Sequence, residues 1–99
     1  MQGLMQEVPL SIPMIIRRAR DLYPEKQVIS RRPDRTISRA TYGEVIARAG
    51  RLAHALEELG LEPGARVATL AWNNQRHLEA YFAIPSAGFV LHTLNLRLH

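Results

Sequence analysis

The strongest constraint on the fold is a strand–helix–strand pattern within residues 66–95. It begins with a mostly apolar run at 67–72, which is too short for a core helix and is typical of a strand buried on both faces. A helix is predicted over 74–87, because Asn74 is a favourable N-cap residue. Residues 89–94 then have the composition of a second strand. Two strands joined by a helix within about 30 residues form a βαβ unit, so we expect them to be parallel.

Helical spacing also predicts which face of this helix is buried. Leu78, Tyr81 and Phe82 form an apolar face, with Ile84 as a further candidate. Large aromatic side chains on such a face belong more often to a core than to a binding site, so we expect Trp72, Tyr81 and Phe82 to pack in the core. The residues expected on the opposite face are Arg76, Glu79 and Ala83.

Two peripheral elements are predicted earlier in the chain. Ser11 followed by Pro13 is a helix-start signal, and an apolar stripe at helical spacing predicts a surface helix over 12–23. Two short β-prone runs between residues 27 and 39 flank a turn at Pro33 and Asp34. This pattern predicts a peripheral β-hairpin.

A third helix has the clearest start signal. Thr41 followed three residues later by Glu44 is the capping-box pattern, and Gly60 is a favourable residue just beyond the end of a helix. Charged residues, including Arg48 and Arg51, are expected outside the packed face. The apolar residues at helical spacing are Val45, Ile46, Ala49, Leu52, Ala53, Leu56 and Leu59.

Composition narrows the class of protein. A hydrophobic content of 46% is ordinary for a folded chain. The absence of cysteine excludes disulfides and thiolate metal sites and is consistent with a cytoplasmic location. No run of about 20 apolar residues occurs, so no transmembrane segment is predicted. Residues 1–10 lack the pattern of a signal peptide and are expected to be a flexible lead, with a partial α/β domain over 11–99.

Arginine dominates the positive charge. The net charge is +4, and twelve of the thirteen basic residues are arginine. Such clusters bind phosphate in some proteins and are simply solvated in others. We favour solvated faces and expect no nucleic-acid partner, because aromatic residues are not interleaved with the arginines. The two clusters are Arg17, Arg18 and Arg20, and Arg31, Arg32, Arg35 and Arg39.

No catalytic constellation is predicted. The histidines lack the spacing of a metal-binding helix, and the serines Ser11, Ser30, Ser38 and Ser86 lie in no nucleophile motif. We interpret His92 as a hydrogen-bonded core residue, with a pocket-lining role as the alternative. Asn73 and Asn74 follow a strand, where α/β proteins place ligands, but a turn and a helix cap explain both. We therefore assign no catalytic, cofactor-binding or metal-binding residue. The histidines are His54, His77, His92 and His99.

Three segments together resemble a known family. They are Thr-Tyr-Gly-Glu-Val at 41–45, Leu-Gly-Leu-Glu-Pro-Gly-Ala-Arg-Val-Ala at 59–68 and Pro-Ser-Ala-Gly-Phe-Val-Leu-His-Thr-Leu-Asn at 85–95. In order and spacing they resemble the N-terminal part of the adenylate-forming (AMP-binding) superfamily. Trp-Asn-Asn at 72–74 and His-Thr-Leu-Asn at 92–95 look most like medium- and long-chain fatty acyl-CoA synthetases. The resemblance extends over residues 10–99.

The resemblance implies an N-terminal portion of the large α/β domain of a fatty acid–CoA ligase. Such an enzyme uses ATP and Mg²⁺ to form an acyl-adenylate and then passes the acyl group to coenzyme A. In the family, the phosphate loop, the adenosine-binding residues and the catalytic lysine lie far beyond residue 99. Two residues depart from the pattern: Ala65, where aspartate is usual, and Leu96, where proline is common.

We therefore expect a scaffold fragment that is inactive alone. Its partner would be the rest of the parent enzyme, whose substrate is a fatty acid, or a second copy bound through exposed apolar surface. The alternative is a free-standing small basic α/β module that binds an anionic partner.

Overall fold

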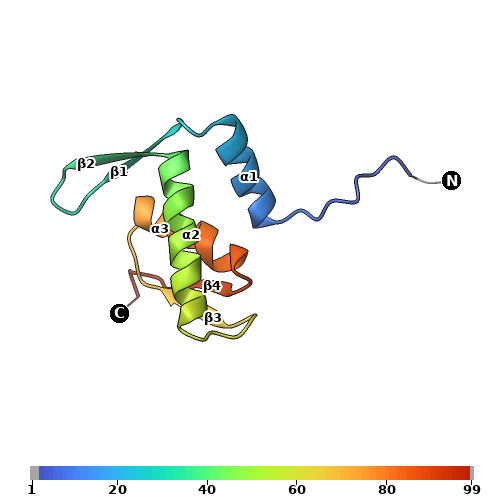
Figure 1. The fold of residues 1–99 in the computed structure, drawn as a ribbon. Coiled ribbons are helices and arrows are strands. Elements are labelled where there is room, and N and C mark those ends of the chain that lie inside the picture. Colours follow the sequence, from blue (N-terminus) through green and yellow to red (C-terminus); the bar gives the residue numbers. More distant parts are fainter. Residues whose placement is uncertain (1–2, 99) are drawn as a thin grey trace.

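The long helix α2 (Tyr42–Glu58) occupies the middle of the molecule, with a hairpin on one side, a short helix on another and a two-stranded sheet near its end (Figure 1). The computed structural model describes residues 3–98. The other elements are α1 (Ile12–Leu22), β1 (Gln27–Arg31), β2 (Ile37–Thr41), β3 (Arg66–Thr69), α3 (Gln75–Ser86) and β4 (Val90–Thr93).

Helix α2 begins with the predicted capping box. The hydroxyl of Thr41 accepts a hydrogen bond from the Glu44 amide at 3.2 Å, and the Glu44 carboxylate accepts one from the Thr41 amide at 2.8 Å. After the helix, Gly60 has a φ of 76°, a left-handed conformation that favours glycine. Both predicted ends of this helix are thus confirmed.

The two peripheral elements are also confirmed. Helix α1 has a proline in its first turn and buries none of its residues, as expected of a surface helix. Strands β1 and β2 form an antiparallel hairpin in which Gln27 pairs with Thr41 and Arg31 pairs with Ile37. Ser30 and Ala40 are the buried residues of the hairpin, so its even-numbered side chains face the body of the molecule.

The βαβ unit has the predicted parallel strands. β3 pairs with β4 from Arg66 opposite Val90 to Thr69 opposite Thr93. The connecting helix α3 is capped by Asn74, whose side-chain oxygen accepts from the His77 amide at 3.2 Å. The strands are shorter than the apolar runs, because the chain leaves the ladder after Thr69.

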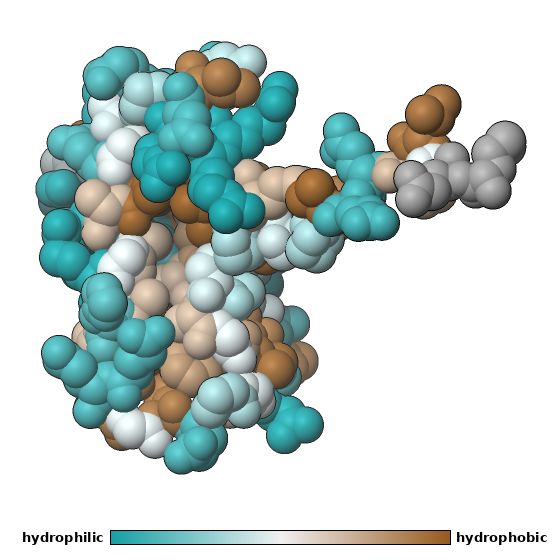
Figure 2. Space-filling model, turned by 45° about the vertical axis from the view of Figure 1, so that its right-hand side comes forward, coloured by the Kyte–Doolittle hydropathy of each residue, from teal (hydrophilic) through white to brown (hydrophobic). Residues whose placement is uncertain are grey.

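The expectation that these strands are buried on both faces is wrong. Val67 and Leu91 pack against the core that α2 and α3 form with Phe89. Helix α3 packs on that face. The other face, with Val90, Ala68 and His92, stays open, and Val90 is 49% exposed. Leu70 and Trp72, just beyond the end of β3, are also exposed, by 68% and 65%. Figure 2 shows one side of the molecule, where hydrophobic atoms reach the surface between hydrophilic regions above and below.

The buried face predicted for α3 is wrong at Tyr81 and right at Ile84, which is buried, while Leu78 and Phe82 are half-buried. Tyr81 is 42% exposed, whereas Glu79 and Ala83, which we placed on the outer face, are buried. The physical reason is that α3 contacts α1, α2, β1, β3 and β4, so several of its sides are covered. A prediction from helical spacing assumes a single covered face. The buried residues of α3 are His77, Glu79, Ala80, Ala83 and Ile84.

None of the helices formed by residues 3–98 is both long and apolar enough to cross a bilayer.

Candidate functional site

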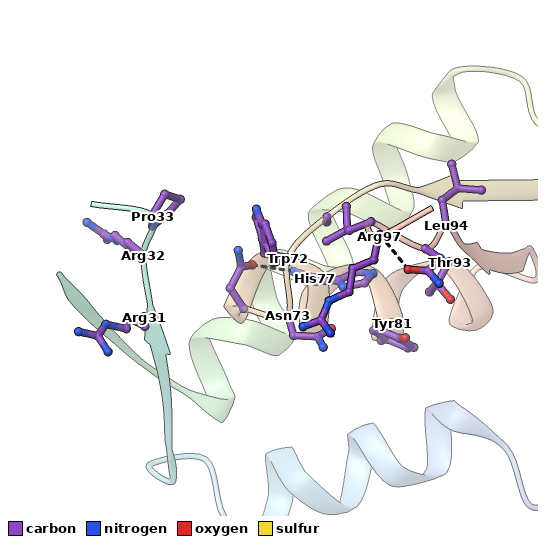
Figure 3. Close-up of a pocket in the computed structure, with 14 residues that line it drawn as sticks. Arg31, Arg32, Pro33, Trp72, Asn73, His77, Tyr81, Thr93, Leu94 and Arg97 are labelled. Atoms are coloured by element: carbon purple, nitrogen blue, oxygen red, sulfur yellow. Dashed lines mark hydrogen bonds between the residues drawn. The ribbon is translucent and has the colours of Figure 1, made fainter. Parts of the chain in front are cut away.

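A hollow lies beyond the carboxyl ends of β3 and β4, the edge of a parallel sheet at which α/β proteins bind ligands. Its volume is about 830 Å³. Figure 3 shows Trp72, His77 and Arg97 gathered on one side of it, with the hairpin strand that carries Arg31 and Arg32 on the other. The lining residues are Arg31, Arg32, Pro33, Ala71, Trp72, Asn73, Asn74, His77, Tyr81, Thr93, Leu94, Asn95, Leu96 and Arg97.

His77 is the most buried polar side chain of this hollow. It is 6% exposed, and its Nε2 lies 3.0 Å from the Thr69 hydroxyl oxygen. The ring also lies against Tyr81, with 4.8 Å between ring centroids and 49° between ring planes. Its Nδ1 is buried and has no hydrogen-bond partner within the described part of the chain. Because an unpaired buried polar atom costs free energy, this nitrogen is a point where a further polar group would be stabilising.

A second polar network fixes the start of α3. The Ser30 hydroxyl accepts from the Gln75 amide at 2.8 Å, which joins the hairpin to the first turn of this helix. The Gln75 side chain donates to Oε1 of Glu79 at 2.9 Å, and Arg48 of α2 donates to the same oxygen at 2.7 Å. Hairpin, α2 and α3 are therefore held together by polar contacts.

The hollow is electropositive. Three arginines line it, at positions 31, 32 and 97, and its lining contains no carboxylate. Mg²⁺ prefers carboxylate and phosphate oxygens, so these residues do not fit a magnesium site. Across residues 3–98, no three histidine, aspartate or glutamate side chains are grouped to hold a metal. A triphosphate cradle of glycine-rich backbone amides is not present in the sequence either, so these residues do not fit bound ATP.

Three sequence interpretations need correction. His92 is exposed rather than buried, because it pairs with Ala68 on the open face of the sheet. Trp72 and Tyr81 are exposed and line the hollow instead of packing in the core. Trp72 is exposed because it follows the end of β3, and Tyr81 because of the rotation of α3.

The other histidines do not join this site. His54 is exposed on α2, with its Nδ1 3.4 Å from Oε2 of Glu57. His99 lies outside the described residues. Of the asparagines, Asn74 caps α3 as predicted, and both Asn73 and Asn74 line the hollow.

Sequence reasoning missed the burial of His77 and Glu79. A signal was present, since His77, Ala80 and Ile84 are spaced by three and four residues and lie on one side of α3. The small alanines Ala80 and Ala83 mark the same buried side. Small side chains are what close packing against two neighbouring elements requires.

Comparison with known proteins identifies the family. Residues 16–99 match the family model described as AMP-binding enzyme. The chain is 46% identical over 98 residues to a 3-methylmercaptopropionyl-CoA ligase of Ruegeria lacuscaerulensis, covering 99% of this chain and 18% of that protein. It is 48% identical over 94 residues to a long-chain-fatty-acid–CoA ligase of Thermus thermophilus, covering 95% of this chain and 17% of that protein. The chain thus spans less than one fifth of the length of these relatives.

The fold agrees. A crystal structure of the N-terminal domain of FACL13 from Mycobacterium tuberculosis matches with a TM-score of 0.74 at 29% identity, covering 89% of this chain and 22% of that one. The resemblance inferred from the three sequence segments is therefore confirmed, and the free-standing basic module is not supported. The chain belongs to the AMP-binding enzyme family and resembles the N-terminal part of its acyl-CoA ligases.

Proposed function

We propose that this chain is the N-terminal scaffold of an ATP-dependent fatty acid–CoA ligase. In that enzyme ATP and Mg²⁺ convert a fatty acid to an acyl-adenylate, and coenzyme A then receives the acyl group. The observation that carries the proposal is the 42–48% identity over nearly the whole chain to ligases named for acyl substrates, two of them for long- and medium-chain fatty acids. A cytoplasmic location, expected from the cysteine-free sequence, is part of the proposal.

The open sheet face supports a scaffold role. Val90 is exposed on it, Leu70 and Trp72 are exposed just beyond the end of β3, and each of the two strands pairs on one side only within the described residues. Parallel strands are normally covered on both faces. We infer that residues 11–99 form part of a domain, that residues 1–10 are a lead, and that the rest of a ligase chain supplies the missing cover. Self-association through the same face is the competing outcome.

The chemistry is assigned to residues outside this segment. The hollow lacks the carboxylates and the phosphate cradle that adenylation needs. We therefore predict that the 99-residue chain alone releases no pyrophosphate from ATP with a fatty acid. Release above a heat-treated control would contradict this assignment.

A chimera tests the scaffold role. The matched segment of the Thermus thermophilus ligase is replaced by this chain, and acyl-CoA formation is measured with a long-chain fatty acid. We expect a folded and active chimera. The reason is that the open face of this chain would contact the same part of the Thermus thermophilus ligase that the native segment contacts. The matched control carries Leu70→Asp and Trp72→Asp, which place charges on the exposed apolar surface just beyond β3 and are expected to abolish activity. A chimera that unfolds cooperatively but forms no acyl-CoA would overturn the proposal.

A further inference from the structure

The outer face of the hairpin carries exposed residues that neither the packing of the core nor the ligase assignment explains. The inward residues are even-numbered, so the odd-numbered side chains face solvent. Among these, Ile29 and Ile37 are 57% and 54% exposed. In the ladder Ile29 lies opposite Arg39, and Arg31 lies opposite Ile37. The exposed face is therefore a checkerboard of isoleucine and arginine.

The turn of the hairpin adds to this charge. The hairpin carries four arginines and one aspartate between Gln27 and Thr41, a net charge of +3 out of +4 for the whole chain. The aspartate, Asp34, accepts hydrogen bonds from the amide and hydroxyl of Thr36. None of the salt bridges formed within residues 3–98 involves these arginines. Their charge is thus available to a partner.

Arg35 occupies a position that favours another residue type. Its φ is 69°, and it is the one residue other than glycine with a positive φ within the described part of the chain. Glycine or asparagine is less strained in that conformation. An arginine at this position adds positive charge to the turn but does not reduce the backbone strain of the positive φ.

The position of the hairpin makes this face accessible. In Figure 1 the hairpin projects from the body of the molecule, on the opposite side from α1. In Figure 3 the side chains of Arg31 and Arg32, which line the rim of the hollow, point away from Trp72 and His77. Both arginines are exposed.

We propose that the outer face of the hairpin, with Ile29, Ile37, Arg31 and Arg39, together with the turn that carries Arg32 and Arg35, docks on an anionic membrane surface. Guanidinium groups pair with lipid phosphates, while the isoleucines and the aliphatic stems of the arginines enter the boundary between headgroups and acyl chains. A nucleic acid fits less well, because no aromatic ring lies between the arginines to stack on a base. An acidic protein would use the charge but not the exposed isoleucines. The proposal does not depend on ligase activity.

The test is co-sedimentation of the full 99-residue chain with vesicles. Phosphatidylcholine vesicles with and without phosphatidylserine are compared at low and high salt, and a vesicle-free sample corrects for self-association. We expect binding only to the vesicles that contain phosphatidylserine, and weaker binding in high salt because salt screens the charges. Equal binding to both vesicle types would overturn the proposal without any substitution.

Substitutions locate the surface. Arg31→Gln with Arg35→Asn should weaken vesicle partitioning by about fivefold for each arginine removed. Asparagine tolerates the positive φ of residue 35, so loss of binding is not explained by unfolding, and far-UV circular dichroism checks this. The matched control, Arg17→Gln with Arg18→Gln, removes the same charge from the exposed face of α1. Equal losses in both double variants would show that only net charge matters and would refute the hairpin site.

The isoleucines separate a membrane from an acidic protein. Ile29→Thr with Ile37→Thr keeps the charge and the strand preference but removes apolar surface, and should weaken partitioning several-fold. Poly-glutamate serves as the acidic-protein probe. If the threonine variant binds vesicles as well as the unmodified chain, and poly-glutamate displaces the unmodified chain from them, the partner is an acidic protein and the membrane proposal is wrong.

Discussion

The ion pair between α2 and α3 gives the sharpest test of the packing. Glu79 is 6% exposed, and its Oε1 accepts hydrogen bonds from Arg48 Nε at 2.7 Å and from Gln75 Nε2 at 2.9 Å. Replacing Arg48 by methionine keeps the aliphatic stem but removes the cation. The Glu79 carboxylate would then be buried with Gln75 as its remaining side-chain donor.

The magnitude follows from burial. Breaking a fully buried ion pair costs about 3–5 kcal/mol, because one charge is left uncompensated. The Arg48 side chain is 44% exposed, so water already solvates part of the pair and can replace part of the lost interaction. We therefore expect Arg48→Met to lower the free energy of unfolding by about 1–2 kcal/mol.

Urea unfolding followed by far-UV circular dichroism measures this loss. Arg51→Met is the matched control on the same helix, because Arg51 is exposed and makes no salt bridge among those formed within residues 3–98. It should change stability by less than about 0.5 kcal/mol. A double-mutant cycle with Glu79→Gln should give a coupling energy of about 1 kcal/mol between positions 48 and 79. A coupling near zero would refute the stabilising role of the pair.

Three further predictions test other parts of the fold. Thr41→Ala should destabilise the chain by about 1 kcal/mol in urea unfolding, since it removes the capping box, and Thr41→Ser should restore most of it; an unchanged midpoint for Thr41→Ala would contradict the cap. Hydrogen bonds from Thr36, the larger from its hydroxyl and the smaller from its amide, hold the pKa of Asp34 below its usual value. The stabilisation that these bonds give the folded chain is therefore present above the ordinary aspartate pKa of about 4 and is lost as pH falls through the lower folded pKa. Carboxyl-carbon NMR titration should show Thr36→Val raising that pKa, and no rise would refute the hydrogen bond. The unmodified chain should bind a hydrophobic dye and self-associate. The double substitution Leu70→Thr with Trp72→Thr should reduce dye binding and self-association, whereas the control Leu4→Thr should not. A monomer that unfolds sharply and binds little dye would instead show a self-sufficient domain.

Local signals predicted the elements well. The capping box at Thr41 and Glu44, the cap at Asn74 and the turn at Pro33 and Asp34 each depend on contacts within a few residues, and the structure contains all three. The parallel pairing of β3 and β4 followed from the length of the connection alone. Such features are predictable because the chemistry that fixes them is close in sequence.

The site was not predictable in the same way. Whether Trp72 lies in a core or on a surface depends on where β3 ends and on what packs beyond that end, and the apolar run at 67–72 contains no signal for either. The burial of Glu79 depends on Arg48, thirty-one residues earlier in the chain. Both outcomes are set by contacts between elements that are distant in sequence. The periodicity of residues within one element carries no information about such contacts.

The polar contacts of α3 fix the rotation of this helix and thereby the position of the open sheet face. His77 bonds to Thr69 at the end of β3, Gln75 bonds to Ser30 of the hairpin, and Glu79 bonds to Arg48 of α2. Three directional contacts to three different elements fix the rotation of the helix, whereas apolar packing alone tolerates several rotations. With that rotation set, Ala80 and Ile84 meet the core and Tyr81 turns toward the hollow. The same contacts that stabilise this segment therefore hold its open sheet face and its hollow in one orientation relative to α2 and the hairpin.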